Sequence, residues 1–129
     1  MIGSVEHMAI AAQDTAGLAT WYRDTLGFEV VVDGGPKGIW FIGPPGAGAT
    51  IEIIPGSAAA RLDRARNDPG WSHLAFTVAD FQAAHAALVA RGIEFQGEPR
   101  QQGDGSWIAF FPDPEGNALQ IVQRPKPLR

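Results

Sequence analysis

The sequence contains no cysteine, which excludes disulfide bonds, thiolate metal sites and a cysteine nucleophile. Basic residues are also few: ten Lys and Arg stand against fourteen Asp and Glu, and they form no basic run. Because the phosphates of nucleic acids require clustered cations, we expect no nucleic-acid partner. Residues 1–14 have neither a basic region nor a long apolar run, so we expect no signal peptide, no membrane span and a cytoplasmic protein.

What is present points to a small folded protein. The chain has 129 residues, of which 45% are hydrophobic, enough to bury the core of a single domain over residues 1–129. Sixteen glycines and ten prolines imply many turns, and therefore short strands rather than long helices.

The first half of the chain contains one helical pattern among strand-like segments. Residues 4–12 alternate as a half-buried strand, Asp14 is a plausible helix N-cap, and a helix over the following segment is expected to end at Gly27. Further strands are expected at 28–33, 39–44 and 50–55, with turns at 34–38 and 45–49.

The same pattern then starts again. WSHLAFTVAD at 71–80 aligns with VEHMAIAAQD at 5–14 without a gap, and a second helix is expected at 81–92. Three later segments also match the first half: RGIEF at 91–95 matches LGFEV at 26–30, SWIAF at 106–110 matches IWFIG at 39–43, and GNALQIV at 116–122 matches GATIEII at 48–54. These matches place His73 over His7, Trp107 over Trp40 and Gln120 over Glu52.

The sequence therefore predicts an α+β fold built from two tandem β-α-β-β-β modules. The modules cover residues 4–55 and 70–123, a partly helical connection covers 56–69, and a tail covers 124–129.

Each module offers one histidine on its first strand and one oxygen-bearing side chain on its last. Glu52 lies between Ile51 and Ile53, so it points to the face opposite these apolar residues, where a carboxylate is costly to desolvate without a cation or metal. Four such positions from two symmetric halves could meet near a pseudo-twofold axis: His7, Glu52, His73 and Gln120.

These four donors suit one divalent transition metal, namely Zn, Ni, Co, Mn or Fe. Two imidazoles, a carboxylate and an amide oxygen fit such an ion better than Ca²⁺, which rarely takes nitrogen, or Cu⁺, which prefers sulfur. Three firm ligands and one weak amide leave coordination positions open, as catalysis requires.

The chain resembles the vicinal oxygen chelate superfamily, which includes glyoxalase I, methylmalonyl-CoA epimerase, fosfomycin- and bleomycin-resistance proteins and extradiol dioxygenases. The motifs that carry the resemblance extend over residues 4–123: VEHMAI, WYRDTLGFEV, ATIEIIP, WSHLAFTVAD and FFPDPEGNALQIVQ. The resemblance implies a glyoxalase-like fold, in which the modules form an open, cup-like, eight-stranded mixed sheet around a metal, often in a homodimer. It also implies the metal ligands His7, Glu52, His73 and Gln120.

One position departs from the pattern of the superfamily. Many members have a glutamate where this chain has Gln120, and a glutamine cannot accept a proton. The role of catalytic base must then fall to Glu52 or to a residue outside the set of four, and Glu52 is the candidate we assign. The resemblance thus favours a metal-dependent lyase or isomerase of the glyoxalase or epimerase type, acting on a small substrate with adjacent oxygens.

Two alternatives remain open. A sequestering antibiotic-resistance protein would hold a bulky ligand without needing a metal, with Trp40 and Trp107 as substrate-binding walls, although core packing explains both tryptophans equally well. An Fe²⁺ extradiol-type dioxygenase would use the triad of His7, His73 and Glu52. Specificity is expected to come from the loops at 33–38, 43–49 and 100–106.

Overall fold

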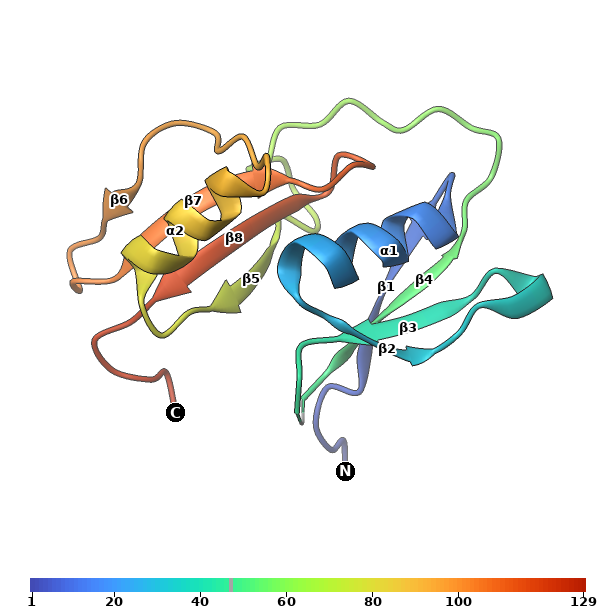
Figure 1. Ribbon diagram of the computed structural model, residues 1–129, viewed down its shortest axis with the longest axis horizontal. Coiled ribbons are helices and arrows are strands. Elements are labelled where there is room, and N and C mark those ends of the chain that lie inside the picture. Colours follow the sequence, from blue (N-terminus) through green and yellow to red (C-terminus); the bar gives the residue numbers. More distant parts are fainter. Residues whose placement is uncertain (47) are drawn as a thin grey trace. The chain divides into compact units, whose positions relative to one another are not determined.

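The computed structural model describes residues 1–46 and 48–129, and its chain divides into two compact units. The N-terminal unit is Met1–Arg61 and the C-terminal unit is Leu62–Arg129. Each unit has one α-helix packed on a four-stranded mixed sheet (Figure 1). The predicted α+β class is therefore confirmed, with the eight strands arranged as two open four-stranded sheets. The turn predicted at 45–49 includes residue 47, which lies outside the described residues.

In the N-terminal unit the sheet order is β1-β4-β3-β2, with β1 parallel to β4 and the other neighbours antiparallel. The elements are β1 (His7–Ala12), α1 (Thr15–Leu26), β2 (Glu29–Val32), the short 3₁₀ helix η1 (Gly35–Lys37), β3 (Trp40–Gly43) and β4 (Thr50–Pro55). The first strand begins at His7 rather than at residue 4.

The limits of α1 follow from its capping residues. The Asp14 carboxylate accepts a hydrogen bond from the backbone N–H of Gly17 at 2.8 Å, as a helix N-cap does. At the other end Gly27 has φ 76°, a left-handed conformation that glycine adopts without a Cβ penalty. Both predicted caps are confirmed. Between them, Leu18 and Tyr22 are buried on the side that packs against the sheet.

The C-terminal unit repeats this topology with the order β5-β8-β7-β6, and β5 is parallel to β8. Its elements are β5 (Leu74–Thr77), α2 (Phe81–Ala90), β6 (Arg100–Gln101), β7 (Trp107–Pro112) and β8 (Ala118–Gln123). Asp80 caps α2 by accepting from the backbone N–H of Ala83 at 3.0 Å. Within the described part of the chain, neither long helix has the length and apolar character needed to cross a membrane.

Two expectations about secondary structure are wrong. Residues 91–95, which match the segment leading into β2, form no strand: Ile93 is buried and Phe95 is half-buried in a loop. The ring of Phe95 stacks on His85 at a centroid distance of 4.1 Å, and pairing with β7 occurs instead at Arg100–Gln101. The connection at 56–69 contains no helix. Its one large apolar side chain, Leu62, is exposed, so a helix there would have no apolar face to bury.

The expected equivalence of the two tryptophans is also wrong. Trp40 pairs with Ile53 on β4, and the counterpart of Ile53 in the second module, Ile121, pairs with Ala109. Ala109 is therefore the counterpart of Trp40, and Trp107 lies two residues earlier along β7. A shift of two residues keeps a side chain on the same face of a sheet, so the sequence alternation could not reveal it.

Candidate functional site

In the N-terminal unit, the sheet face opposite α1 carries the predicted histidine and glutamate. Ile51 and Ile53 are buried on the helix side of β4, and Glu52 points to the other side between them. Glu52 is in register with Phe41 of β3, and its carboxylate Oε2 lies 3.4 Å from Nε2 of His7. The strand alternation thus brings together the two members of the first predicted pair.

A second carboxylate holds the other nitrogen of the same imidazole. Nδ1 of His7 hydrogen-bonds to Oε2 of Glu6, and the His7 ring meets Phe41 edge-on at a centroid distance of 5.8 Å. The hydrogen bond to Glu6 raises the pKa of His7 above its usual 6.5, the charges of Glu6 and Glu52 add to this rise, and desolvation opposes it.

This arrangement fits a metal ligand. If Nδ1–H donates to Glu6, Nε2 carries a lone pair directed to the side where Glu52 lies, and a carboxylate on the second nitrogen is the usual partner of a metal-binding histidine. Two atoms bound to a tetrahedral zinc ion at about 2.0–2.1 Å lie about 3.3–3.4 Å apart. The spacing of 3.4 Å between Nε2 and Oε2 therefore suits a shared ion.

The C-terminal unit presents its pair on the corresponding sheet face. His73 lies directly before β5, its Nδ1 is 2.8 Å from Oγ of Ser72, and its ring meets Phe110 edge-on at 5.0 Å. Gln120 is in register with Phe110 and is 8% exposed. As in the first unit, the residue before the histidine hydrogen-bonds to its Nδ1.

A cation accompanies this second pair. The guanidinium carbon of Arg66 lies 3.6 Å from the centroid of the Phe110 ring, a cation–π contact. Burial lowers the pKa of His73, and the charge of Arg66 lowers it further. Sequence reasoning left both Arg66 and Glu6 without a role. Glu6 directly precedes a candidate ligand, which is a weak signal, and Arg66 has no spacing signal at all.

We refer to His7 with Glu52 as the N-terminal half-site and to His73 with Gln120 as the C-terminal half-site. Among residues 1–46 and 48–129, no three His, Asp or Glu side chains form a group that could hold a metal ion. Each half-site is therefore a pair of residues, and a neighbouring side chain hydrogen-bonds to the histidine of each pair: Glu6 to His7 and Ser72 to His73.

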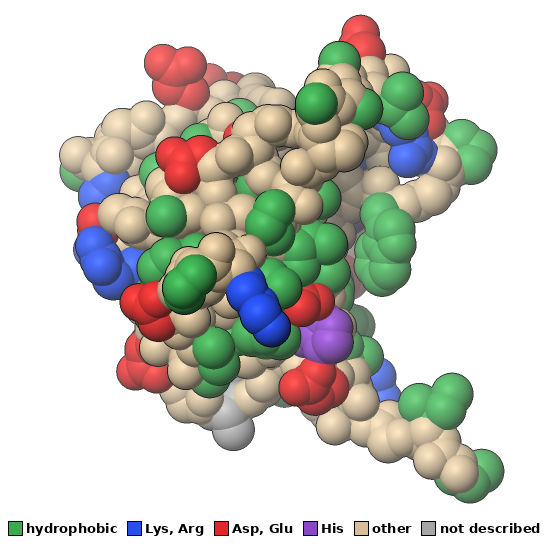
Figure 2. Space-filling view, turned by 90° about the vertical axis from the view of Figure 1, so that its right-hand side faces the viewer, with side chains coloured by type: hydrophobic (Ala, Val, Ile, Leu, Met, Phe, Trp, Pro, Cys, Tyr) green, Lys and Arg blue, Asp and Glu red, His purple; other side chains and the backbone are tan. Residues whose placement is uncertain are grey.

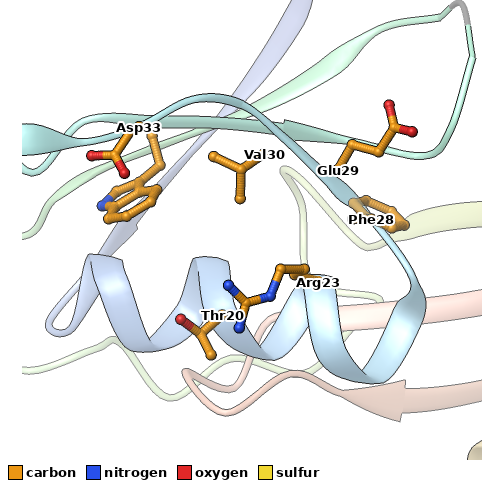
Figure 3. A pocket seen from close by; sticks show the side chains of 7 residues that line it. Thr20, Arg23, Phe28, Glu29, Val30 and Asp33 are labelled. Carbon is orange, nitrogen blue, oxygen red and sulfur yellow. The ribbon is translucent and has the colours of Figure 1, made fainter.

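The two tryptophans lie on the helix side of their sheets, away from the half-sites. Trp107 packs against Phe81 of α2, with ring centroids 5.8 Å apart. Trp40 lines a pocket of about 510 Å³ between α1 and β2. Figure 3 shows Thr20 and Arg23 of α1 across this pocket from Val30 of β2.

Charged side chains are dispersed on the face drawn in Figure 2. The Lys and Arg side chains of that face are scattered among acidic and apolar ones and gather in no basic patch. This distribution agrees with the net charge of −4.

Comparisons with known proteins agree with this fold. The sequence model of the Glyoxalase/Bleomycin resistance protein/Dioxygenase superfamily matches residues 4–121. The ethylmalonyl-CoA/methylmalonyl-CoA epimerase of Cereibacter sphaeroides is 30% identical over 132 residues, which cover 94% of this chain and 96% of that enzyme.

Solved structures show the same architecture. A superfamily member from Sphaerobacter thermophilus DSM 20745 aligns with a TM-score of 0.76 at 26% identity, covering 96% of this chain and 99% of the other. TnmS3, an antibiotic binding protein from Streptomyces sp. CB03234, aligns with a TM-score of 0.74 at 24% identity, covering 95% and 97% of the two chains. The fold of this chain is thus shared with an antibiotic binding protein.

Proposed function

The chain belongs to the Glyoxalase/Bleomycin resistance protein/Dioxygenase superfamily, and we propose that it is a divalent-metal-dependent lyase or isomerase acting on a small substrate with adjacent oxygens. The observation that carries this proposal is the N-terminal half-site. His7 directs Nε2 to within 3.4 Å of Glu52 Oε2 while Glu6 occupies its other nitrogen, an arrangement typical of a metal ligand and not required for packing on an exposed sheet face.

The proposed ligands are His7, Glu52, His73 and Gln120, which would hold one Zn, Ni, Co, Mn or Fe ion. In both histidines a neighbouring side chain hydrogen-bonds to Nδ1, so Nε2 is the nitrogen proposed to bind the ion. The lowered pKa of His73 supports a neutral imidazole, the form that can bind a cation. When bound, a divalent ion would stabilise the negative charge that develops on two adjacent substrate oxygens.

Glu52 is the proposed base of the reaction. Its side chain is 22% exposed, so its carboxylate is accessible to a substrate. Glu52 would act as a base only through a carboxylate oxygen that the ion does not hold, because a carboxylate bound to a metal is a weak base. Gln120, in the corresponding position of the other unit, cannot accept a proton. The role of base therefore belongs to the N-terminal half-site.

The identity to an epimerase supports isomerase chemistry over the two alternatives. That enzyme is similar to this chain over nearly its whole length. A homodimer and a small-molecule substrate are proposed with it, on the same superfamily resemblance, and light scattering of the purified protein would test the dimer.

Elemental analysis of freshly purified protein tests the proposal. We expect about one equivalent of a transition metal per chain, lost in His73→Ala and in His7→Ala while circular dichroism and the unfolding transition show that both variants remain folded. His85→Ala is the matched control, since the half-buried His85 stacks between Phe81 and Phe95 on the helix side of its sheet and should not affect metal content.

The other outcomes contradict the proposal in distinguishable ways. Wild-type protein without metal that binds a bulky ligand equally well after chelator treatment would be a sequestering protein. Oxygen uptake with a catechol after anaerobic iron loading would identify a dioxygenase instead.

A further inference from the structure

Arg66 brings a positive charge to the C-terminal half-site without a carboxylate partner. Its guanidinium lies over Phe110, and Phe110 also contacts His73 and is in register with Gln120. None of the ion pairs found in the described part of the chain involves Arg66. The charge therefore lies beside two proposed metal ligands and is not neutralised by the protein.

The segment that carries Arg66 is held in place by its neighbours. Arg64 donates to the backbone carbonyl oxygens of Asp68, at 3.4 Å, and Pro69. The Asp68 carboxylate accepts from the backbone N–H of Ala65 at 2.8 Å, and the backbone N–H of Asp68 donates to the Ala65 carbonyl at 3.0 Å. Arg64 thus stabilises the loop, whereas the N–H groups of Arg66 remain available.

The guanidinium of Arg66 is exposed to solvent, which weakens its charge interactions with the neighbouring side chains but does not abolish them. It repels a protonated His73, and it would also repel a divalent cation bound by His73 and Gln120. An anionic group on the ligand removes both repulsions. A guanidinium matches a carboxylate in geometry, through two parallel N–H···O bonds, and one guanidinium balances one carboxylate charge.

Because the site is that of the proposed function, the inference rests on that function and adds the charge of the substrate. We propose that Arg66 binds a carboxylate of the substrate, and that the substrate is a small carboxylic acid with an oxygen on the neighbouring carbon, such as a 2-oxo or 2-hydroxy acid. The ring of Phe110 packs against one face of the guanidinium, which orients it and excludes water from that face. Arg66 is thus a substrate-binding residue that selects substrates with a carboxylate.

Pyruvate and methyl pyruvate are matched probes for this proposal, since they share two adjacent oxygens and differ in charge. Both are titrated into chelator-treated protein and into zinc-loaded protein, with binding followed by nuclear magnetic resonance of the Arg66 Nε–H and the Gln120 side-chain amide. In both forms we expect pyruvate to bind at least about tenfold more tightly than methyl pyruvate. In Arg66→Gln this preference should disappear, and Arg66→Lys should retain part of it.

Arg91→Gln is the charge-matched control. Arg91 caps the end of α2, on the opposite side of the sheet from Phe110, and its removal should leave the preference for pyruvate intact. Equal binding of the two probes, or a preference that survives in Arg66→Gln, would overturn the proposal.

Zinc content separates this proposal from the proposed function. Loss of the pyruvate preference in an Arg66→Gln protein that still holds about one zinc supports both. A wild-type protein that prefers pyruvate but binds no zinc would retain the anion site and lose the metal-dependent function. A wild-type protein that binds zinc without preferring pyruvate would support the metal-dependent function and contradict the anion site.

Discussion

The two units have the same scaffold but opposite electrostatic surroundings at their half-sites. In each, a histidine at the start of the first strand has Nδ1 bound by the preceding residue, and an oxygen-bearing side chain lies on the last strand. At the N-terminal half-site, two carboxylates raise the pKa of the histidine: that of the neighbouring Glu6, which has the larger effect, and that of Glu52. The C-terminal half-site has a neutral amide in place of a carboxylate, and burial lowers the pKa of its histidine, with the charge of the neighbouring Arg66 lowering it further. Symmetry of the backbone therefore does not require symmetry of the chemistry.

This difference suggests a division of tasks. The carboxylates of the N-terminal half-site can offset the charge of a bound dication and accept a proton. The buried amide of Gln120 and the guanidinium of Arg66 can instead orient an anionic substrate. Neither set of side chains could perform both tasks, because a carboxylate repels an anion and a guanidinium cannot act as a base at neutral pH.

The largest expected effect comes from exchanging the chemistry of the half-sites. Glu52→Gln should lower turnover of the substrate by about 10²–10⁴-fold, the usual contribution of a positioned base. The double variant Glu52→Gln/Gln120→Glu moves the carboxylate to the C-terminal half-site and should recover metal content, measured by elemental analysis, more fully than turnover. The carboxylate would then lie beside Arg66, where ion pairing lowers its basicity.

Full turnover in the single variant would remove Glu52 from the chemistry. Full recovery of turnover in the double variant would show that the two half-sites are equivalent, contrary to the division of tasks.

The features that could be predicted from the sequence are those that depend on local patterns, namely helix caps and the alternation of side chains along a strand. Asp14 and Gly27 limit α1 through hydrogen bonds and φ values that depend on residues within a few positions. The alternation of Ile51, Glu52 and Ile53 determines which side chain faces away from the helix. The pairing of His7 with Glu52 followed from the same alternation on two neighbouring strands.

The missed features depend on contacts that periodicity does not describe. Glu6 precedes the first residue of β1, so the alternation that would place its side chain opposite His7 does not apply to it. Arg66 reaches Phe110 from a loop without regular structure, across 44 residues of sequence. The counterpart of Trp107 could be found only from the pairing of β7 with β8. A shift of two residues in the alignment of SWIAF with IWFIG leaves the same side chains on the same face of the sheet, so the sequence does not distinguish the two alignments.

A smaller effect is expected from a packing difference between the units. Gly34 is buried beside Trp40, and a Cβ on Gly34 would lie 2.2 Å from Nε1 of the indole, whereas Trp107 packs on Phe81 instead. Gly34→Ala should therefore destabilise the protein by about 1–3 kcal/mol, the usual cost of overpacking, as measured by urea unfolding. Gly103→Ala is the control, since nothing lies within 4 Å of its added Cβ. Equal stability of the two variants would show that the indole moves aside without cost.

The smallest expected effect is the opposite pH dependence of the two half-site histidines. In metal-free protein, nuclear magnetic resonance should show His7 losing its proton above pH 6.5 and His73 below it. Because its pKa is raised in the folded protein, His7 contributes stability that is complete below about pH 6.5 and is lost as the pH rises through the raised value. The sign reverses for His73: its lowered pKa favours the folded state above about pH 6.5, and this contribution is lost as the pH falls toward the lowered value.

Two charge-removing variants isolate the cause of each shift. Glu6→Gln should move the titration of His7 down toward 6.5, and Arg66→Gln should move that of His73 up toward it. Arg66→Gln should act less strongly, because burial is the larger cause of the lowered pKa of His73 and remains after the charge is removed. A common midpoint for both histidines in the wild-type protein would show that the half-sites do not differ electrostatically. The assignment of base and anion-binding roles to different units would then lose its physical basis.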